Sequence, residues 1–362
     1  MRRQSIRGAQ APTAPPSYAP PGREASRPPR AASGRAAGPE GRPAADPRVT
    51  RRRRRHPVRA LLVVLLVLAV AWPVGLLLWA NGKIQHTEAL SGAPDTPGTT
   101  YLLAGSDSRS DGSIPDGTEG QRADTIMVLH VPASGTASLI SLPRDTLVQI
   151  PDHGANKLNA AFSLGGPPLL VRTVESLTGL TVDHYVQIGM GGVQHVVDAV
   201  GGVELCLDYD VSDPRSELEW TSGCHLADGR TALAFSRMRY GDPKGDIGRG
   251  ERQRQVIGAV VKEVATPATL LNPADQVQLI DAGTNALVVD QDSGIIDLGR
   301  MALAFRSATG PDGIVGTPPI ANTGYRPGGG LGSTVLLDEN RTPGFFGRMR
   351  DGTLTKADVE AP

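Results

Sequence analysis

A run of apolar residues that follows a block of arginine is the feature that most restricts how this chain can fold. Residues 51–55 are five consecutive arginines, and residues 61–80 contain no charged side chain. A helix of that length crosses the hydrocarbon core of a bilayer. Trp72 and Pro73 lie within the run, and a transmembrane helix tolerates proline better than a soluble helix does. We therefore predict a transmembrane helix at residues 59–81 rather than a buried soluble helix, which seldom stays apolar over such a length.

The charge around this helix predicts its orientation. Arginines are abundant before it and basic residues are scarce directly after it, so the positive-inside rule places the N-terminus in the cytoplasm and the larger part of the chain outside. A cleaved signal peptide would have a shorter apolar stretch and a small residue where this chain has Leu78. We therefore expect a single-pass protein of the cell membrane, held in contact with membrane lipid by an uncleaved anchor.

The segment before the helix differs from the rest of the chain in composition. Residues 1–50 include ten prolines and almost no large apolar side chain, so residues 1–58 are expected to be a disordered, basic cytoplasmic tail. Residues 1–60 carry fifteen arginines against three acidic residues, whereas the remainder carries 22 basic and 34 acidic residues. This polarity excludes a uniformly basic nucleic-acid-binding protein, and no nucleic-acid partner is expected.

After the helix, the hydropathy pattern alternates between strand-like and helix-like segments. Residues 82–98 are rich in turn formers and are expected to be a linker, followed by a folded body at residues 99–345 and a C-terminal tail at residues 346–362. Strands are predicted at residues 101–104, 125–131, 137–142, 184–188, 203–207 and 334–337, and helices at residues 157–164, 169–177, 193–200, 247–265 and 274–287. A turn signal at residues 132–135 predicts a hairpin. The expected fold class is α/β, with three α/β/α layers around a central mixed sheet.

The only two cysteines are Cys206 and Cys224, and both lie in the part of the chain that we place outside the cell. Disulfides persist in that environment, so we predict that the two residues pair. The alternative is two buried free thiols. Neither cysteine belongs to a Cys-x-x-Cys motif, so the sequence gives no support for a redox or metal site at these positions.

Several common catalytic motifs are absent from the sequence, including the phosphate-binding loop, the dinucleotide-binding glycine motif, the serine-hydrolase elbow and His-Glu-x-x-His. Acidic residues instead occur at the predicted strand ends, where α/β proteins usually place their sites. Asp107 follows the first predicted strand and Asp124 precedes the second. Two carboxylates at neighbouring strand ends can hold Mg²⁺ or Mn²⁺, which prefer oxygen ligands.

Arginines follow the same distribution. Arg237 and Arg239 would face the same side of an extended segment. Asp246, Arg249 and Gln253 would share one face at the N-terminal end of a helix, which favours anions. Guanidinium groups can bind phosphate oxygens with two parallel hydrogen bonds, and four arginines are candidates for this role: Arg144, Arg237, Arg239 and Arg249. The spacing predicts a metal-assisted diphosphate site, and the alternative for each residue alone is a surface ion pair.

Six motifs occur in a fixed order along the body. They are Gly-Ser-Asp-Ser-Arg at residues 105–109, Arg-Ala-Asp-Thr at 122–125, Ser-Leu-Pro-Arg-Asp-Thr at 141–146, Lys-Leu-Asn-Ala-Ala-Phe at 157–162, Asp-Ala-Val-Gly-Gly-Val at 198–203, and an Arg-x-Arg-Tyr, Asp-x-x-Arg, Arg-Gln series at 237–253. In this order they resemble the motifs of the LytR-CpsA-Psr family. The resemblance covers about residues 99–265 and extends to about residue 340.

The resemblance implies a phosphotransferase that moves a glycopolymer from a polyprenyl diphosphate carrier to peptidoglycan. A phosphodiester would form and polyprenyl phosphate would be released, with pyrophosphatase activity as a side reaction. By the same resemblance, Asp107 and Asp124 bind the divalent metal. The diphosphate is bound and oriented by Arg122, Arg144, Arg237, Arg239 and Arg249, while Asp246 and Gln253 hold those arginines in place. The expected catalytic residues are Arg144, Arg237, Arg239 and Asp124. Residues 241–245 are expected to be a variable loop without a role.

Two other functions fit part of the same pattern. A wall-binding or carrier-binding scaffold would use the same site to hold the lipid without turning it over. A membrane-linked transcriptional attenuator would use residues 51–55 to contact DNA. Five arginines beside a membrane helix are explained more simply as a topology signal that contacts anionic headgroups.

Overall fold

The computed structural model describes residues 57–106, 123–238, 242, 246–266, 269 and 271–359. The chain divides into residues 1–56 and residues 57–362, and the first of these units lies outside the described residues. The predicted disordered tail at residues 1–58 therefore falls almost entirely outside them as well.

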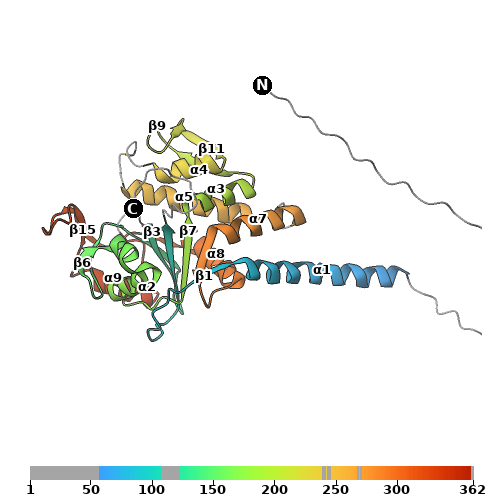
Figure 1. The fold of residues 1–362 in the computed structure, drawn as a ribbon, viewed down its shortest axis with the longest axis horizontal. Helices are drawn as coiled ribbons and strands as arrows, with labels where there is room; N and C mark the ends of the chain where they lie inside the picture. Colours follow the sequence, from blue (N-terminus) through green and yellow to red (C-terminus); the bar gives the residue numbers. More distant parts are fainter. Residues whose placement is uncertain are drawn as a thin grey trace, which may run out of the picture. The chain divides into compact units, whose positions relative to one another are not determined.

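A seven-stranded mixed sheet forms the centre of the body, in the order β1-β12-β7-β2-β3-β4-β13 (Figure 1). Its antiparallel core is the pair β2–β3 and the pair β3–β4, whereas β7 runs parallel to β2 and β13 parallel to β4. The strands are β1 (Gln85–Thr87), β2 (Thr99–Ser106), β3 (Ala123–Val131), β4 (Ser138–Leu142), β7 (His184–Gly189), β12 (Leu287–Asp290) and β13 (Ile314–Gly316). The predicted mixed sheet and the hairpin at residues 132–135 are confirmed.

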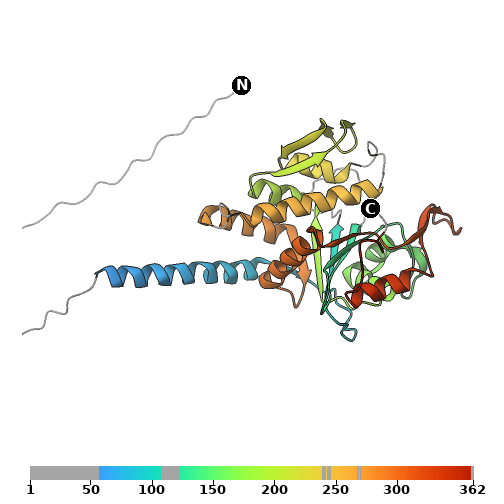
Figure 2. The same cartoon turned by 180° about the vertical axis from the view of Figure 1, so that it is seen from behind.

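The central strands are apolar on both faces because each face is covered by helices. Leu102 and Val128 pack on one face, whereas Tyr101 and Leu129 pack on the other, since successive side chains of a strand point to opposite sides. Helices α2 (Leu158–Thr178) and α9 (Thr342–Arg350) cover the first face. Helices α5 (Asp246–Val264) and α8 (Ile295–Thr309) cover the second (Figures 1 and 2). The three-layer α/β/α prediction is confirmed.

Helix α2 is one bent element where the sequence predicts two helices, at residues 157–164 and 169–177. Gly165 and Gly166 have non-helical backbone angles, and Gly166 has a φ of +64°. Two prolines follow at residues 167 and 168, where they begin the second helical part, since proline is tolerated in a first helical turn. The two predicted helices are therefore two arms of one bent element.

A second, smaller core lies beyond α5. Two helices contribute to it, α3 (Met190–Ala199) and α4 (Gly229–Arg237). Two antiparallel strand pairs complete it: β8 (Val203–Leu207) pairs with β11 (Gly223–Ala227), and β9 (Val211–Asp213) pairs with β10 (Leu218–Trp220). Cys206 and Cys224 face each other across β8 and β11 and form a disulfide, as the sequence predicts. Two further hairpins, β5 (Leu147–Ile150) with β6 (Gly154–Lys157) and β14 (Ile320–Tyr325) with β15 (Thr334–Leu337), extend from the body.

Helix α1 (Pro57–Lys83) contains the apolar run and is the one helix in the described residues that is long and apolar enough to span a membrane. Its last turns contact helix α7 (Pro273–Ala286). The Trp72 indole donates a hydrogen bond to the Gln276 side chain at 2.7 Å, and Lys83 forms an ion pair with Asp281.

Two predicted boundaries are wrong. The predicted linker, residues 82–98, includes strand β1, which pairs with β12, and Ala89, which is 3% exposed in the main core. The predicted C-terminal tail, residues 346–362, includes most of α9, and Phe346 and Met349 are each 1% exposed. Both segments are short and rich in turn formers, so their few apolar side chains give no periodic signal. Their burial depends on the core that they cover.

Candidate active site

A cavity of about 610 Å³ opens where β3 begins and β4 ends, between helix α5 and strand β15. In the ladder between β3 and β4, Ile126 lies opposite Leu142. Two residues further along, the same antiparallel register places Asp124 opposite Arg144, so the two motifs meet although twenty residues separate them. Polar residues around the opening line the cavity, while Ile126, Leu142 and Val335 contribute apolar wall.

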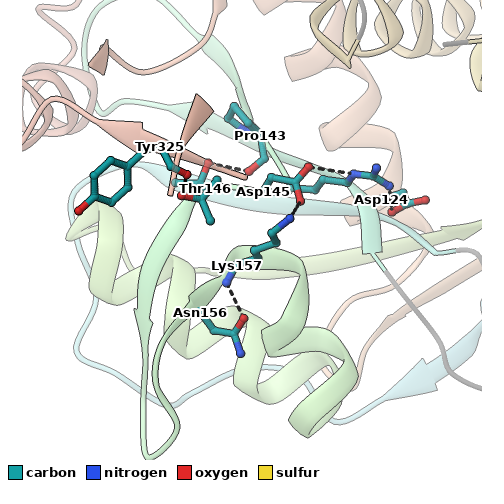
Figure 3. A network of polar contacts seen from close by, with 9 residues as sticks. Asp124, Pro143, Asp145, Thr146, Asn156, Lys157 and Tyr325 are labelled. Atoms are coloured by element: carbon teal, nitrogen blue, oxygen red, sulfur yellow. Dashed lines mark hydrogen bonds and ion pairs between the residues drawn. The ribbon is translucent and has the colours of Figure 1, made fainter. Parts of the chain in front are cut away.

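Four charged side chains form a chain of ion pairs along one wall (Figure 3). Arg144 donates from Nη1 to Asp124 Oδ1 at 2.6 Å, and its Nε lies 3.6 Å from Asp145 Oδ2. Lys157 Nζ lies 2.8 Å from Asp145 Oδ1. The side chains of Arg144 and Asp124 are only 19% and 14% exposed, so this pair is screened less by water than a surface pair. The arrangement fixes the guanidinium of Arg144 at the edge of the cavity.

The local backbone explains why these residues meet. Pro143 ends β4, and its carbonyl accepts hydrogen bonds from the backbone N–H of Thr146, at 2.9 Å, and from the Thr146 hydroxyl, at 2.6 Å. The resulting turn directs Arg144 and Asp145 toward the cavity. The backbone N–H of Leu158 donates to the Thr146 carbonyl, which holds the start of α2, and with it Lys157, against this turn.

Helix α5 forms the opposite wall through Arg249, Gly250, Gln253 and Arg254. Arg249 and Gln253 are four residues apart and share one helix face, as the sequence predicts. The Thr125 hydroxyl donates to Gln253 Oε1 at 2.6 Å, which links α5 to the start of β3. Arg254 donates from Nη1 to the Ser141 hydroxyl on β4 at 2.6 Å.

The charges of the cavity lining are unbalanced. Arg144, Lys157, Arg249 and Arg254 supply four positive charges, and only Asp124 and Asp145 supply negative ones among the described lining residues. The excess of two positive charges matches a doubly negative ligand. A diester of diphosphate carries two negative charges at neutral pH, and its oxygens accept the hydrogen bonds that guanidinium and ammonium groups donate.

The other predicted site residues are distributed unevenly. Asp107, Arg122 and Arg239 lie outside the described residues, as does the side chain of Asp246, whose backbone begins α5. Arg237 is the last residue of α4 and does not line the described cavity. Its charge acts on Glu217, whose pKa is lowered mainly by Arg230 and to a smaller extent by Arg237.

Residue Arg252, to which the sequence assigns no role, holds the segment after α4 in place. The residue is 4% exposed. Its guanidinium donates from Nε to the Phe235 carbonyl at 3.0 Å, and also donates to the Met238 carbonyl and to Asp242. The two carbonyls lie on either side of Arg237. Asp242 falls within residues 241–245, which the sequence analysis treats as a loop without a role. That interpretation is wrong for Asp242, because its side chain is 2% exposed and paired with Arg252.

The sequence also assigns no role to Lys157, Asp145 or Ser141. Lys157 and Asp145 both fall inside motifs that carry the family resemblance, and this was the available signal. Ser141 begins one of these motifs too, whereas Arg254 directly follows the last motif and belongs to none of them. Their contact joins β4 to α5 over more than one hundred residues of sequence, and no local pattern encodes it.

The described residues are compatible with an oxygen-ligated divalent metal at Asp124. No group of three or more His, Cys, Asp or Glu side chains able to hold a metal occurs within the described residues. Asp124 offers a carboxylate at the cavity, and Thr125 beside it offers a hydroxyl. Hard oxygen donors of this kind suit Mg²⁺ and Mn²⁺. The predicted second carboxylate, Asp107, lies outside the described residues.

The chain is an α/β/α protein with a cavity whose described lining carries more positive than negative charges. Comparison with known proteins identifies its family. Residues 80–307 match the profile of the LytR_cpsA_psr family. The chain belongs to this family, as the ordered motifs predict.

Three known proteins illustrate the similarity. The probable cell wall biosynthesis protein LcpB of Corynebacterium glutamicum is 40% identical over 283 residues, which cover 75% of this chain and 66% of LcpB. The polyisoprenyl-teichoic acid–peptidoglycan teichoic acid transferase TagU of Enterococcus faecalis is 37% identical over 213 residues, covering 58% of this chain and 67% of TagU. The LytR-Csp2A-Psr enzyme from Actinomyces oris has the same fold, with a TM-score of 0.58 at 20% identity, covering 74% of this chain and 95% of that structure. The chain thus spans about two thirds of the length of the two curated relatives.

Proposed function

We propose that this protein is a phosphotransferase that moves a glycopolymer from a polyprenyl diphosphate carrier to peptidoglycan. The observation that carries the proposal is the cavity between β3, β4 and α5, whose described lining has two more positive than negative charges. A diphosphate diester is the substrate that this charge balance suits. Membership of the LytR_cpsA_psr family supports the choice of substrate, since a relative in that family is named a teichoic acid transferase that acts on peptidoglycan.

In the proposed reaction, a hydroxyl oxygen of the peptidoglycan acceptor attacks the phosphorus atom that bears the sugar. A new phosphorus–oxygen bond forms, and the bond from that phosphorus to the bridging oxygen breaks. Polyprenyl phosphate leaves with the electron pair, and the acceptor proton passes to a base. Asp124 or Asp107 can take this role only where its carboxylate is not fully committed to the metal. Attack by water in place of the acceptor would give the pyrophosphatase side reaction.

The residues of the cavity have separable roles in this proposal. Arg144 and Arg249 bind the phosphoryl oxygens and neutralise the charge that grows on the leaving phosphate, which is the main requirement of phosphoryl transfer. Asp124, through its 2.6 Å contact, orients Arg144. Gln253 connects Thr125 to α5 and so sets the position of Arg249. Arg122, Arg237 and Arg239 remain proposed diphosphate ligands, and Asp246 a proposed positioning residue.

A divalent cation, Mg²⁺ or Mn²⁺, is proposed as the cofactor, with Asp124 and Asp107 as its protein ligands. When bound, it would neutralise phosphate oxygens and so polarise the phosphorus atom toward attack. The proposed topology places α1 in the cell membrane with the N-terminus in the cytoplasm and the cavity outside, where peptidoglycan is found.

The test uses the full chain in detergent with a polyprenyl diphosphate-linked sugar and a peptidoglycan fragment, with and without Mg²⁺. Mass spectrometry would detect the sugar-phosphate adduct and free polyprenyl phosphate. We expect both products only with the metal, and their loss in Arg144→Gln but not in Arg300→Gln, a change at an exposed arginine of α8. Binding of the lipid without any release would instead support the carrier-binding scaffold.

A further inference from the structure

Arg254 is a buried cation with one hydrogen-bond partner and no ion pair among the described residues. The residue is 7% exposed, and its one hydrogen bond within the described residues is donated to the Ser141 hydroxyl at 2.6 Å. Within the same residues no carboxylate lies at ion-pair distance from it. Burial lowers the pKa of Arg254, and the charge of Glu251, three residues earlier on α5, has the smaller, opposite effect. The guanidinium nevertheless stays charged, since arginine is effectively always protonated in proteins.

Arg252 shows how the same helix treats a buried arginine with a purely structural role. It is 4% exposed, yet it is satisfied by the carboxylate of Asp242 and by two backbone carbonyls. Among the described residues, Arg254 has one neutral hydroxyl in place of all of these. Burying a charge without a counter-charge is strongly unfavourable. A guanidinium has five N–H donors, and the one described hydrogen bond of Arg254 uses only one of them, so a bound ligand could accept hydrogen bonds from others.

The position of Arg254 identifies where that partner would bind. Arg254 and Ser141 both line the cavity that also contains Arg144, Arg249 and Lys157. Arg144 lies beyond the end of β4, whereas Ser141 lies within the strand, so the Ser141 contact holds Arg254 deeper along the sheet. Asp124 and Asp145 pair with Arg144 and Lys157, which leaves Arg254 as a cation whose charge no described carboxylate of the cavity neutralises by contact.

We infer that Arg254 is a direct ligand of the anionic phosphoryl oxygens at the inner end of this cavity, and that Ser141 orients its guanidinium. The inference rests on the proposed function only for the identity of the natural ligand, a diphosphate diester. Independently of that function, we infer an anion-binding site in which Arg254 contacts the ligand and Ser141 positions the guanidinium of Arg254.

The test measures binding of inorganic pyrophosphate to the full chain in detergent by isothermal titration calorimetry. Loss of a charge-assisted hydrogen bond typically weakens binding about 10- to 100-fold, and we expect this for Arg254→Met. Arg254→Lys keeps the charge but loses the bidentate hydrogen-bond geometry of the guanidinium, so its affinity for pyrophosphate should lie between those of the wild-type protein and Arg254→Met. Ser141→Ala should weaken binding less than Arg254→Met, and combining it with Arg254→Met should add little.

A second readout separates this role from a structural one. Because an uncompensated buried charge opposes folding, Arg254→Met should keep or raise the Tm of the ligand-free protein, while the rise in Tm caused by pyrophosphate is lost. Arg306→Gln, at an exposed arginine of α8, is the matched control and should change neither the Tm of the ligand-free protein nor the rise caused by pyrophosphate.

Unchanged pyrophosphate affinity in a folded Arg254→Met variant, or a Tm that falls with affinity retained, would overturn the inference. Pyrophosphate binding that depends on Arg254 in a protein without transfer activity would support the inference while refuting the proposed function.

Discussion

At the scale of single residues, the site depends on pairs that the sheet register brings together. Asp124 and Arg144 belong to different motifs, but the antiparallel ladder of β3 and β4 aligns them. Lys157 and Asp145 then extend the pairing to the first turn of α2. A guanidinium carries five N–H groups and an ammonium three, so a cation held by a carboxylate can also donate to a ligand.

Arg144 provides the most direct test of these pairs. Arg144→Gln should lower kcat/KM for glycopolymer transfer by about 100-fold, because it removes a charge-assisted contact to the phosphoryl oxygens in the transition state. Arg144→Lys should recover part of the loss. Steady-state kinetics on both variants would check this, and transfer that proceeds equally well in all three proteins would remove Arg144 from the site.

His130 predicts how stability depends on pH. Its ring is buried and hydrogen-bonded to the Thr100 hydroxyl at 3.0 Å from Nδ1, and burial lowers the pKa of His130 despite the opposing effects of the Arg350 backbone and Asp183. The folded state therefore binds the proton less well than the unfolded state does. The contribution of His130 to the free energy of unfolding should be fully present above about pH 6.5, the ordinary pKa of histidine. It should be lost as the pH falls below that value, by at most about 1.4 kcal/mol per pH unit.

Urea denaturation between pH 5 and pH 8 would measure this dependence. His130→Gln should weaken it, whereas His153→Gln, at an exposed site, should retain it. A stability that is equally pH-dependent with and without His130 would show that other groups are responsible.

At the scale of secondary-structure elements, helix α5 organises both sides of the body. One side carries the cavity residues, and the other packs against the small core of α3, α4 and the β8–β11 pair. Gln255 connects α5 to strand β8 of the small core. Its side chain donates to the Cys206 carbonyl at 3.1 Å and accepts from the Cys206 N–H at 3.3 Å. The disulfide strand is therefore attached to the helix that carries Arg249, Gln253 and Arg254.

Removing the disulfide should destabilise this half of the body. Cys206 and Cys224 are 18 residues apart, and closing a loop of that size stabilises a fold by about 3 kcal/mol in the chain-entropy view. We expect Cys206→Ser with Cys224→Ser to lower the free energy of unfolding by about 2 to 4 kcal/mol. Denaturant titration of the double variant would measure the loss, and alkylation of two thiols in the unreduced wild-type protein would contradict the pairing.

Helix α9 offers a test of where the folded body ends. Phe346 is 1% exposed and packs with Phe345 in the main core, at ring centroids 5.1 Å apart. Phe346→Ala should therefore cost about 3 to 5 kcal/mol of stability. Leu226→Ala, whose side chain is 75% exposed, should cost less than about 0.5 kcal/mol. Equal thermal stability of the two variants would mean that α9 is peripheral after all.

At the scale of the whole molecule, the route from α1 to the sheet is short. Helix α1 ends at Lys83 and β1 begins at Gln85, so an edge strand of the sheet follows the apolar helix almost at once. Lys83 contacts Asp281 on α7 and lies 4.8 Å from the centre of the Trp79 ring. In the proposed topology, this connection would set the distance between the cavity and the bilayer surface without a flexible spacer.

The membrane proposal predicts a simple fractionation result. The full chain should remain with the membrane after alkaline carbonate and be released only by detergent, because burying twenty apolar residues of helix in lipid is strongly favourable. Replacing Leu65 and Leu66 with arginine should move the protein to the soluble fraction. Release of the unchanged chain by carbonate would show that α1 does not span the membrane.

The sequence by itself determined the features that depend on local composition and period. Short-range patterns predicted the apolar run of α1, the strands β2, β3 and β4, the two helical parts of α2, and the shared helical face of Arg249 and Gln253. The ordered motifs also identified the family. The tertiary structure alone decided which distant residues meet: Arg254 with Ser141, Arg252 with Asp242, and β1 and α9 with the core. Isolated residues and short segments of this kind carry no periodic signal, because their burial and pairing energies arise only when the rest of the fold encloses them.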